Sequence, residues 1–256
     1  MSISRHLSRA WFKTALEKLG AVLLDLLFPI RCLECHALKN TLHNPHGYLC
    51  RACFEKIKLN SWLFCPVCNR KLINLQTCPT HSRFALKTLG AACNYNQPLV
   101  KKLVWQYKYG FKEPLAEPLA LLLSSYFQKV FLPLLGSTEN LVICPLPLYP
   151  VRERWRGFNQ AQLLATNFAK QNNLPCVTLL KRIKFQKPQM EIKIRQQRFT
   201  NIKDSFCVLP EIKLHNQTII LVDDIAASGA TLLEAAKTLR QAGARKVYGL
   251  VLARNL

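Results

Sequence analysis

Acidic residues are scarce in this sequence of 256 residues, which has 14 Asp and Glu against 36 Lys and Arg and a formal net charge of +22. The excess is concentrated in residues 151–203, which hold twelve Lys and Arg and only two acids. A field of this sign attracts polyanions, whether nucleic acid, phosphorylated small molecules or an anionic membrane. The charge alone does not distinguish among these ligands.

Long hydrophobic runs are also lacking, since no segment approaches eighteen uninterrupted apolar residues. The apolar stretch from Ala21 to Phe28 contains Asp25 and carries no small-residue cleavage site, so we expect neither a membrane span nor a secretory signal. Hydrophobic residues still make up 50% of the chain, which excludes wholesale disorder. We therefore expect a folded cytoplasmic protein.

Cysteine, in contrast, is abundant, with 11 residues. Without a secretory context, paired thiols indicate metal ligands rather than disulfides. Three Cys-x-x-Cys pairs and a Cys-x-x-His pair of the same spacing provide ligands for two tetrahedral zinc sites. We expect sequential pairing, while the spacing also permits a cross-braced one. The expected ligands are Cys32, Cys35, Cys50 and Cys53 for one zinc, and Cys65, Cys68, Cys78 and His81 for the other. The four single cysteines, Cys93, Cys144, Cys176 and Cys207, are expected to be inert core residues.

Apolar periodicity divides the chain into parts. Residues 5–27 have the spacing of an amphipathic helix, which we expect to pack on the rest of the protein, although a basic helix of this kind also suits a membrane surface. From residue 84 onward, predicted strands alternate with helices, which is typical of a mainly parallel α/β sheet with helices on both faces. The predicted strands are 88–95, 141–147, 218–222 and 247–253, and the predicted helices are 97–108, 114–131, 158–173 and 231–241.

The stretch Thr218–Thr231 combines an apolar strand, an acidic pair, a loop of small residues and a helix. At the carboxyl end of a central strand, Asp223 and Asp224 would face the crevice where open α/β sheets bind ligands, and carboxylates there can accept hydrogen bonds from a ribose diol. The small loop lets backbone N–H groups approach a phosphate, and the next helix adds its positive end. Thr231 and Glu234 form a capping-box pattern that predicts the start of that helix. The predicted loop residues are Ala226, Ala227, Ser228, Gly229, Ala230 and Thr231.

A basic block follows the predicted strand 141–147. Arginine suits bidentate phosphate contacts, so Arg154 and Arg156, with Arg152 beside them, are candidates for binding a pyrophosphate, and Asn159 is a candidate for orienting a substrate. A solvated basic face is the competing interpretation. Aromatic residues interleave with charge around Trp105 and Trp155, a pattern that suits single-stranded nucleic acid as well as core packing.

The residues Asp223 to Thr231 resemble the phosphoribosyl-pyrophosphate (PRPP) motif of type I phosphoribosyltransferases. The resemblance narrows to the ComF family of competence proteins because of three further features: the Leu-Leu-Phe-Pro before the Cys pairs, the central Pro145-Leu-Pro147 with Arg156-Gly-Phe-Asn-Gln160, and Gln189 with Arg198 and Asn201. It implies that Asp223 and Asp224 hold the ribose hydroxyls and that Ala227 to Thr231 cradle the 5′-phosphate. Ala227 and Ser228 stand where two threonines are usual, so one hydroxyl contact to phosphate is lost.

The resemblance implies a type I phosphoribosyltransferase-like α/β domain behind a zinc-ribbon-like module. The expected domains are an amphipathic N-terminal helix (1–30), a zinc-binding module (31–83) and a phosphoribosyltransferase-like domain (84–256). We expect the protein to be a competence factor needed for DNA uptake that binds PRPP with magnesium. We also expect it to handle incoming single-stranded DNA and to interact with other competence or DNA-processing proteins. The alternative is an active phosphoribosyltransferase on a nucleobase or amine acceptor, with no direct DNA contact. No general base or acceptor can be named from the sequence.

Overall fold

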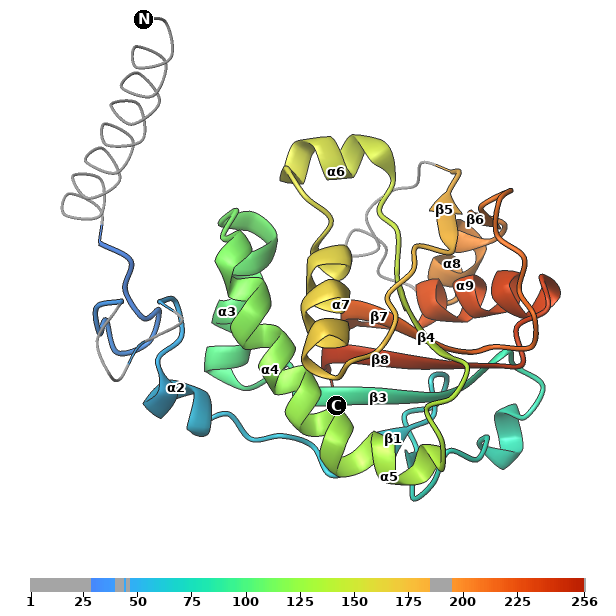
Figure 1. Ribbon diagram of the computed structural model, residues 1–256, viewed down its shortest axis with the longest axis horizontal. Coiled ribbons are helices and arrows are strands. Elements are labelled where there is room, and N and C mark those ends of the chain that lie inside the picture. The colour runs from blue at the N-terminus through green and yellow to red at the C-terminus, as the bar shows by residue number, and fades with distance from the viewer. Residues whose placement is uncertain (1–28, 40–43, 45–46, 185–194, 256) are drawn as a thin grey trace, which may run out of the picture. The chain divides into compact units, whose positions relative to one another are not determined.

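The computed structural model describes residues 29–39, 44, 47–184 and 195–255 (Figure 1). The helix predicted at 5–27 lies outside the described residues. The chain divides into two compact units, Met1–Cys53 and Phe54–Leu256, and a short helix α2 (Arg51–Glu55) spans the division. This division falls inside the predicted zinc-binding module, so the three-part domain organisation stays a prediction.

The second unit is built on a six-stranded sheet with the order β2-β1-β3-β8-β7-β4. Neighbours among β3, β8, β7 and β4 are parallel, whereas β1 pairs antiparallel with both β3 and β2. The mainly parallel sheet predicted from the sequence is confirmed, and two strands of the Cys-rich segment extend it. The bounds are β1 Leu63–Phe64, β2 Lys71–Leu72, β3 Leu86–Asn94, β4 Leu141–Pro145, β7 Thr218–Ala226 and β8 Lys246–Arg254.

Helices cover both faces of this sheet (Figure 1). α4 and α7 pack on one face against β4, β7 and β8, and α9 packs on the other against β3, β7 and β8. A small antiparallel pair, β5 (Leu180–Arg182) and β6 (Phe206–Val208), lies beside α9. The helices are α3 Pro98–Tyr109, α4 Ala116–Tyr126, α5 Leu132–Leu135, α6 Pro150–Arg156, α7 Gln160–Gln171, α8 Arg195–Ile202 and α9 Ala230–Gln241, with a π-helical turn at Phe127–Phe131 and 3₁₀ turns at Pro79–His81 and Glu113–Leu115.

Alternation along β7 explains how this strand joins two cores. Its residues Ile219 and Leu221 belong to the apolar cluster that includes Leu232, Ala235 and Leu239 of α9. Successive side chains of a strand point to opposite faces, so Ile220 and Val222, which are also fully buried, face the α7 side. The predicted burial of Cys93 and Cys144 is confirmed, whereas Cys176 and Cys207 are only partly buried.

Two local predictions differ from the structure, and one helix was not predicted. β7 runs four residues beyond the predicted end at Val222, because Asp223 and the residues up to Ala226 remain paired with β8. The predicted capping box is wrong, since the N-cap of α9 is Gly229 and Glu234 instead accepts a hydrogen bond from the backbone N–H of Asp204 at 2.9 Å. The sequence pattern also missed α6, which holds the basic block in a helix that starts at Pro150.

One helical stretch among the described residues, Glu113–Leu135, is long and apolar enough to cross a bilayer by length and composition. Half of its most apolar window is buried inside the protein, as in the core helix of a globular fold. Its largest side chains pack in that core, where Tyr126 and Phe127 are at most 1% exposed. Burial within the fold therefore accounts for its apolar composition.

Candidate ligand-binding site and metal clusters

A cavity of about 390 Å³ opens where β4 and β7 end and α6, α7 and α9 begin. Asp223 and Asp224 line it from β7, Ala227 and Thr231 from the loop and the start of α9, and Arg152 and Arg156 from α6. Parallel strands direct their carboxyl ends to one edge, and the loops there form the ligand crevice of open α/β sheets. The structure therefore brings the predicted acidic pair, small-residue loop and basic block together.

The two acids differ in their surroundings because they point to opposite faces of β7. Asp224 is 4% exposed, and its backbone N–H donates to Asp223 Oδ1 at 2.8 Å. Burial and the nearby charge of Asp224 raise the pKa of Asp223 to about 7. The Asp223 carboxyl thus titrates near neutral pH, and the pair can present either one or two negative charges to a ligand.

Lys108, in the last turn of α3, is a residue of the site that the sequence analysis did not single out. Its Nζ lies 2.9 Å from Asp224 Oδ1, and both side chains are largely buried. Burial alone opposes a charged ammonium, but the carboxylates of Asp224 and Asp223 raise the pKa of Lys108 overall. The ion pair compensates the charge of Asp224 inside the protein. In the sequence, the only sign of a role for Lys108 was its position among the aromatic residues of α3. Its pairing with Asp224 could not be predicted, because α3 lies more than a hundred residues before β7.

The small-residue loop turns sharply at Gly229, whose φ is +76°. A Cβ at this position would lie 2.6 Å from the carbonyl oxygen of Pro66, so only glycine fits against this neighbouring segment. Ser228 is buried, and its Oγ accepts a hydrogen bond from the Ala230 N–H at 3.4 Å. Among the six predicted loop residues, Ala227 and Thr231 line the cavity, whereas the buried Ala226, Ser228, Gly229 and Ala230 shape the turn behind it.

The predicted arginines do not share one environment. Arg156 lines the cavity, lies over the Tyr109 ring at 5.6 Å and donates from Nη1 to Gln160 Oε1 at 3.0 Å. Arg154 is exposed on α6 and does not line the cavity. Arg182 of β5 lines it instead, and burial with the charge of Arg152 lowers the pKa of Arg182 to about 10, which leaves it charged at neutral pH. Four cations and two acids thus line the cavity.

Arg156 Nε and Gln160 Nε2 are among the buried donors beside the cavity that have no hydrogen-bond partner within the described part of the chain. Gln160 is only 2% exposed, and its backbone carbonyl is already held by the Tyr107 hydroxyl at 2.8 Å. Buried donors are normally paired, so these two are suited to an oxygen-rich ligand. Asn159 also lines the cavity, but its Oδ1 accepts from the N–H groups of Ala161 and Gln162 as the N-cap of α7. Its side chain positions the helix that carries Gln160.

The eight predicted metal ligands form two groups of four, and within each group the ligand atoms lie within 4.8 Å of one another. Cys32, Cys35, Cys50 and Cys53 lie in the first compact unit, and Cys65, Cys68, Cys78 and His81 lie in the second. The grouping is sequential, not cross-braced. Four thiolates, or three with one imidazole, form the tetrahedral donor set that zinc prefers.

The second cluster packs against the turn that lies behind the cavity. Pro66, inside the Cys-x-x-Cys turn of this cluster, contacts Gly229 of the small-residue loop. Arg254, fully buried at the end of β8, donates to the carbonyl oxygens of Cys65 at 3.3 Å and Pro66 at 3.1 Å. The metal cluster and the ligand-binding loop are therefore neighbours within one folded unit.

Two family models match the chain: a double zinc ribbon domain at residues 23–82 and a phosphoribosyl transferase domain at residues 156–256. The fold and the two metal clusters define the same class of protein as these two family models do. In this class, a double zinc ribbon is followed by a type I phosphoribosyltransferase-like α/β domain. The first match and the Cys/His clusters support zinc as the metal.

Three similar proteins extend over most of the chain. Competence protein F of Haemophilus influenzae is 28% identical over 89% of this chain and 98% of its own length. Competence protein ComFC of Bacillus subtilis is 26% identical over 79% of this chain and 82% of its own length. DNA utilization protein YhgH of Salmonella typhimurium is 29% identical over 81% of this chain and 97% of its own length. Over most of its length the chain is therefore similar to proteins named for competence and for DNA utilization, and it combines a double zinc ribbon with a phosphoribosyl transferase domain.

Proposed function

We propose that this chain is a cytoplasmic competence factor whose α/β domain binds PRPP with magnesium and which handles incoming single-stranded DNA. The relatives named competence and DNA utilization proteins support the biological role. Support for the ligand comes from one observation: a single cavity joins an acidic pair, a small-residue loop at a helix N-terminus and the unpaired donors of Arg156 and Gln160. This combination suits a sugar that carries several phosphates.

In this proposal, each predicted group of residues binds one part of the PRPP molecule. Asp223 and Asp224 accept hydrogen bonds from the ribose hydroxyls, and the loop from Ala227 to Thr231 with the N-terminus of α9 holds the 5′-phosphate. Arg156 and Arg152 face the pyrophosphate. The residues fit magnesium as well, since carboxylates and phosphate oxygens are the ligands it prefers, and bound magnesium would neutralise the pyrophosphate charge. Arg154, which does not line the cavity, is assigned to the surface instead.

The DNA-handling part of the proposal depends on charge and on the double zinc ribbon. The formal net charge of +22 attracts a polyanion, and filled tetrahedral zinc sites have no open position for catalysis. We therefore assign the eight Cys and His ligands a structural role. A protein that handles incoming DNA would require other DNA-processing proteins as partners.

Calorimetric titration of PRPP with magnesium tests the ligand. We expect the wild type to bind and the Asp223→Asn/Asp224→Asn variant to lose binding, because amides cannot replace both carboxylates. Asp204→Asn is the matched control, since Asp204 is exposed, pairs with Lys237 in solvent and does not line the cavity. Absence of binding by zinc-loaded, folded wild type would refute the PRPP site.

A second candidate function is phosphoribosyl transfer to a nucleobase or amine. The raised pKa of Asp223, about 7, favours it, because a general acid or base works best when its pKa lies near the operating pH. A general base of this kind was not identifiable from the sequence. Release of pyrophosphate on addition of an acceptor would demonstrate turnover, and PRPP binding without release would leave PRPP as a ligand only.

A further inference from the structure

Four aromatic side chains gather on the surface beside the cavity. We call Trp105, Tyr109, Phe111 and Trp155 the ring cluster. Trp105 lies 6.1 Å from Tyr109, and Trp155 lies 6.4 Å from Tyr109 and 6.2 Å from Phe111, measured between ring centroids. The rings come from α3, the segment after it and α6, which are separated by about forty residues of sequence.

Three of these rings remain exposed and Tyr109 is half-buried, although other rings nearby are buried. Trp105 is 54% exposed, Phe111 55% and Trp155 63%. Tyr107 and Phe158, which interleave with them in the sequence, are instead buried against each other at 5.6 Å. The protein therefore assigns the interleaved aromatic residues to two uses, and an exposed cluster of large rings marks a binding surface.

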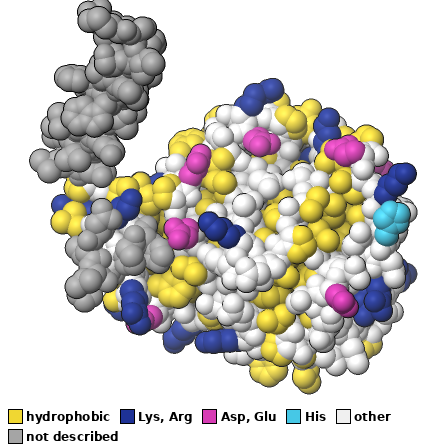
Figure 2. All heavy atoms as spheres, viewed as in Figure 1, with side chains coloured by type: hydrophobic (Ala, Val, Ile, Leu, Met, Phe, Trp, Pro, Cys, Tyr) yellow, Lys and Arg dark blue, Asp and Glu magenta, His cyan; other side chains and the backbone are white. Residues whose placement is uncertain are grey.

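The ring cluster is continuous with the cavity and with positive charge. Tyr109 belongs to both the cluster and the cavity wall, and Arg156 lies over its ring. Lys101 and Lys102 lie one helical turn before Trp105 on α3, both exposed, and Arg154 is exposed next to Trp155 on α6. Two exposed acids, Glu113 and Glu153, interrupt this charge without cancelling it. Figure 2 shows basic side chains interspersed with hydrophobic ones on one face of the molecule.

We propose that the ring cluster is the surface on which the bases of single-stranded DNA stack, with Lys101, Lys102 and Arg154 on the phosphates. The inference rests on the proposed DNA-handling function and adds its location. Alternating rings and cations suit a single strand because every base has an aromatic face and every linkage has a phosphate. At this location Arg154, which does not line the cavity, would bind a phosphate of the DNA.

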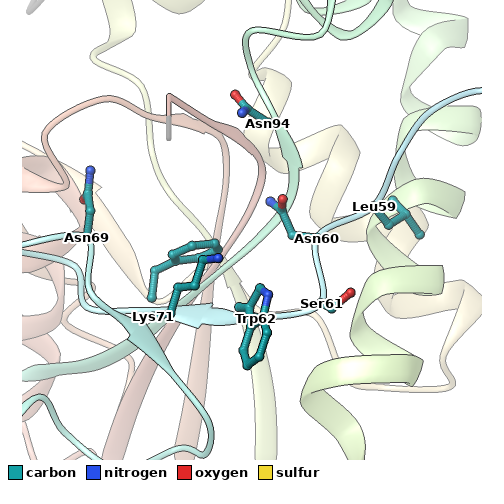
Figure 3. Close-up of a pocket in the computed structure, with 8 residues that line it drawn as sticks. Leu59, Asn60, Ser61, Trp62, Asn69, Lys71 and Asn94 are labelled. Carbon is teal, nitrogen blue, oxygen red and sulfur yellow. The ribbon is translucent and has the colours of Figure 1, made fainter.

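The remaining described tryptophan provides a contrast. Trp62 is 44% exposed and borders a cavity of about 510 Å³ whose polar lining consists mainly of Asn60, Ser61, Asn69 and Asn94 (Figure 3). The Nζ of Lys71 makes a cation–π contact with the Trp62 ring at 5.3 Å. Among the described residues, no second aromatic ring contacts Trp62. Trp62 is thus an exposed indole without a ring cluster, which makes it a matched control.

The test measures binding of a fluorescent (dT)20 oligonucleotide by anisotropy at fixed salt. We expect Trp155→Ala and Trp105→Ala each to weaken binding roughly tenfold or more, the loss associated with one stacked base. Trp62→Ala should stay within about twofold of wild type. Because all three side chains lie at the surface and none is buried in the core, each variant should remain folded, and PRPP titration of the same proteins tests whether the cavity is intact.

The possible results separate this inference from the function on which it rests. Equal oligonucleotide affinity in wild type and all three variants would overturn the ring-cluster surface while leaving DNA handling in place. Absence of oligonucleotide binding by wild type would refute DNA handling and the inference together, with the PRPP titration still deciding the cavity. Loss of PRPP binding in Trp155→Ala with unchanged oligonucleotide binding would assign the rings to the cavity and also overturn the inference.

Discussion

Among single residues, Lys108 couples directly to both acids of the pair. Its ammonium lies 2.9 Å from Asp224 and lowers the pKa of Asp223, whereas burial and the charge of Asp224 raise that pKa to about 7. The balance leaves Asp223 half-ionised near neutral pH. A small change in local charge therefore changes how many hydrogen bonds the pair can accept.

PRPP affinity should depend on pH through this balance. Asp223 is mostly protonated at pH 6 and mostly ionised at pH 8, and the carboxylate is the stronger acceptor of hydroxyl hydrogen bonds, so affinity should rise across this range. Lys108→Gln removes a charge that lowers the pKa of Asp223, and the rise should move to higher pH. Calorimetric titrations of both proteins from pH 6 to 9 measure the shift, and the ionisation of PRPP itself is common to both. Lys108→Arg, which keeps the charge, should follow wild type; identical profiles for Lys108→Gln and wild type would contradict this coupling.

At the scale of elements, the start of α9 is set by a backbone conformation. Thr231 and Glu234 have the spacing of a capping box, but the helix begins after Gly229 because the chain must turn with positive φ against Pro66. Close approach of a segment more than 150 residues earlier in the chain decides this local geometry. Local sequence preferences could not have indicated it.

Gly229→Ala should therefore be more damaging than an equivalent change elsewhere. Gly157, at the C-cap of α6, has nearly the same φ of +75° but has no atom within 4 Å of an added Cβ. Gly157→Ala should cost about 1–2 kcal/mol in the free energy of unfolding, from backbone strain alone. Gly229→Ala adds a contact of 2.6 Å with a carbonyl oxygen and should cost clearly more. Urea unfolding of both variants measures the difference, and equal costs would show that Pro66 moves away freely.

For the whole molecule, the second metal cluster is part of the α/β fold. β1 and β2 continue its sheet, and Arg254 and Gly229 both contact the Cys65–Pro66 turn. The first cluster belongs to a separate compact unit. The two zinc sites should therefore affect the cavity differently.

Loss of one ligand from each cluster tests this difference. Cys78→Ser should release the zinc of the second cluster, loosen the turn behind Gly229 and weaken PRPP binding several-fold. Cys50→Ser should release the other zinc and leave PRPP affinity unchanged. Metal analysis confirms that each variant has lost one zinc, and calorimetry measures the affinity. Equal affinities in the two variants would show that the second cluster does not support the ligand-binding loop.

Features that depend on local pattern could be predicted from the amino-acid sequence. The eight ligands at regular x-x spacing, the alternation of strands and helices and the acidic pair before a small-residue loop are all readable in a linear chain, because each depends on neighbours a few residues apart. The mainly parallel sheet and the position of Asp223 and Asp224 at the cavity followed from them, whereas the spacing left the metal pairing open and the structure showed it to be sequential.

Contacts between residues far apart in the chain became known from the three-dimensional fold. It placed Lys108 on Asp224, Arg182 in the cavity and Arg154 outside it, and it separated the exposed ring of Trp155 from the buried ring of Phe158. Such contacts depend on the packing of helices on opposite faces of the sheet, and side-chain burial on a surface helix depends on what packs against it. No spacing within the chain encodes that choice locally.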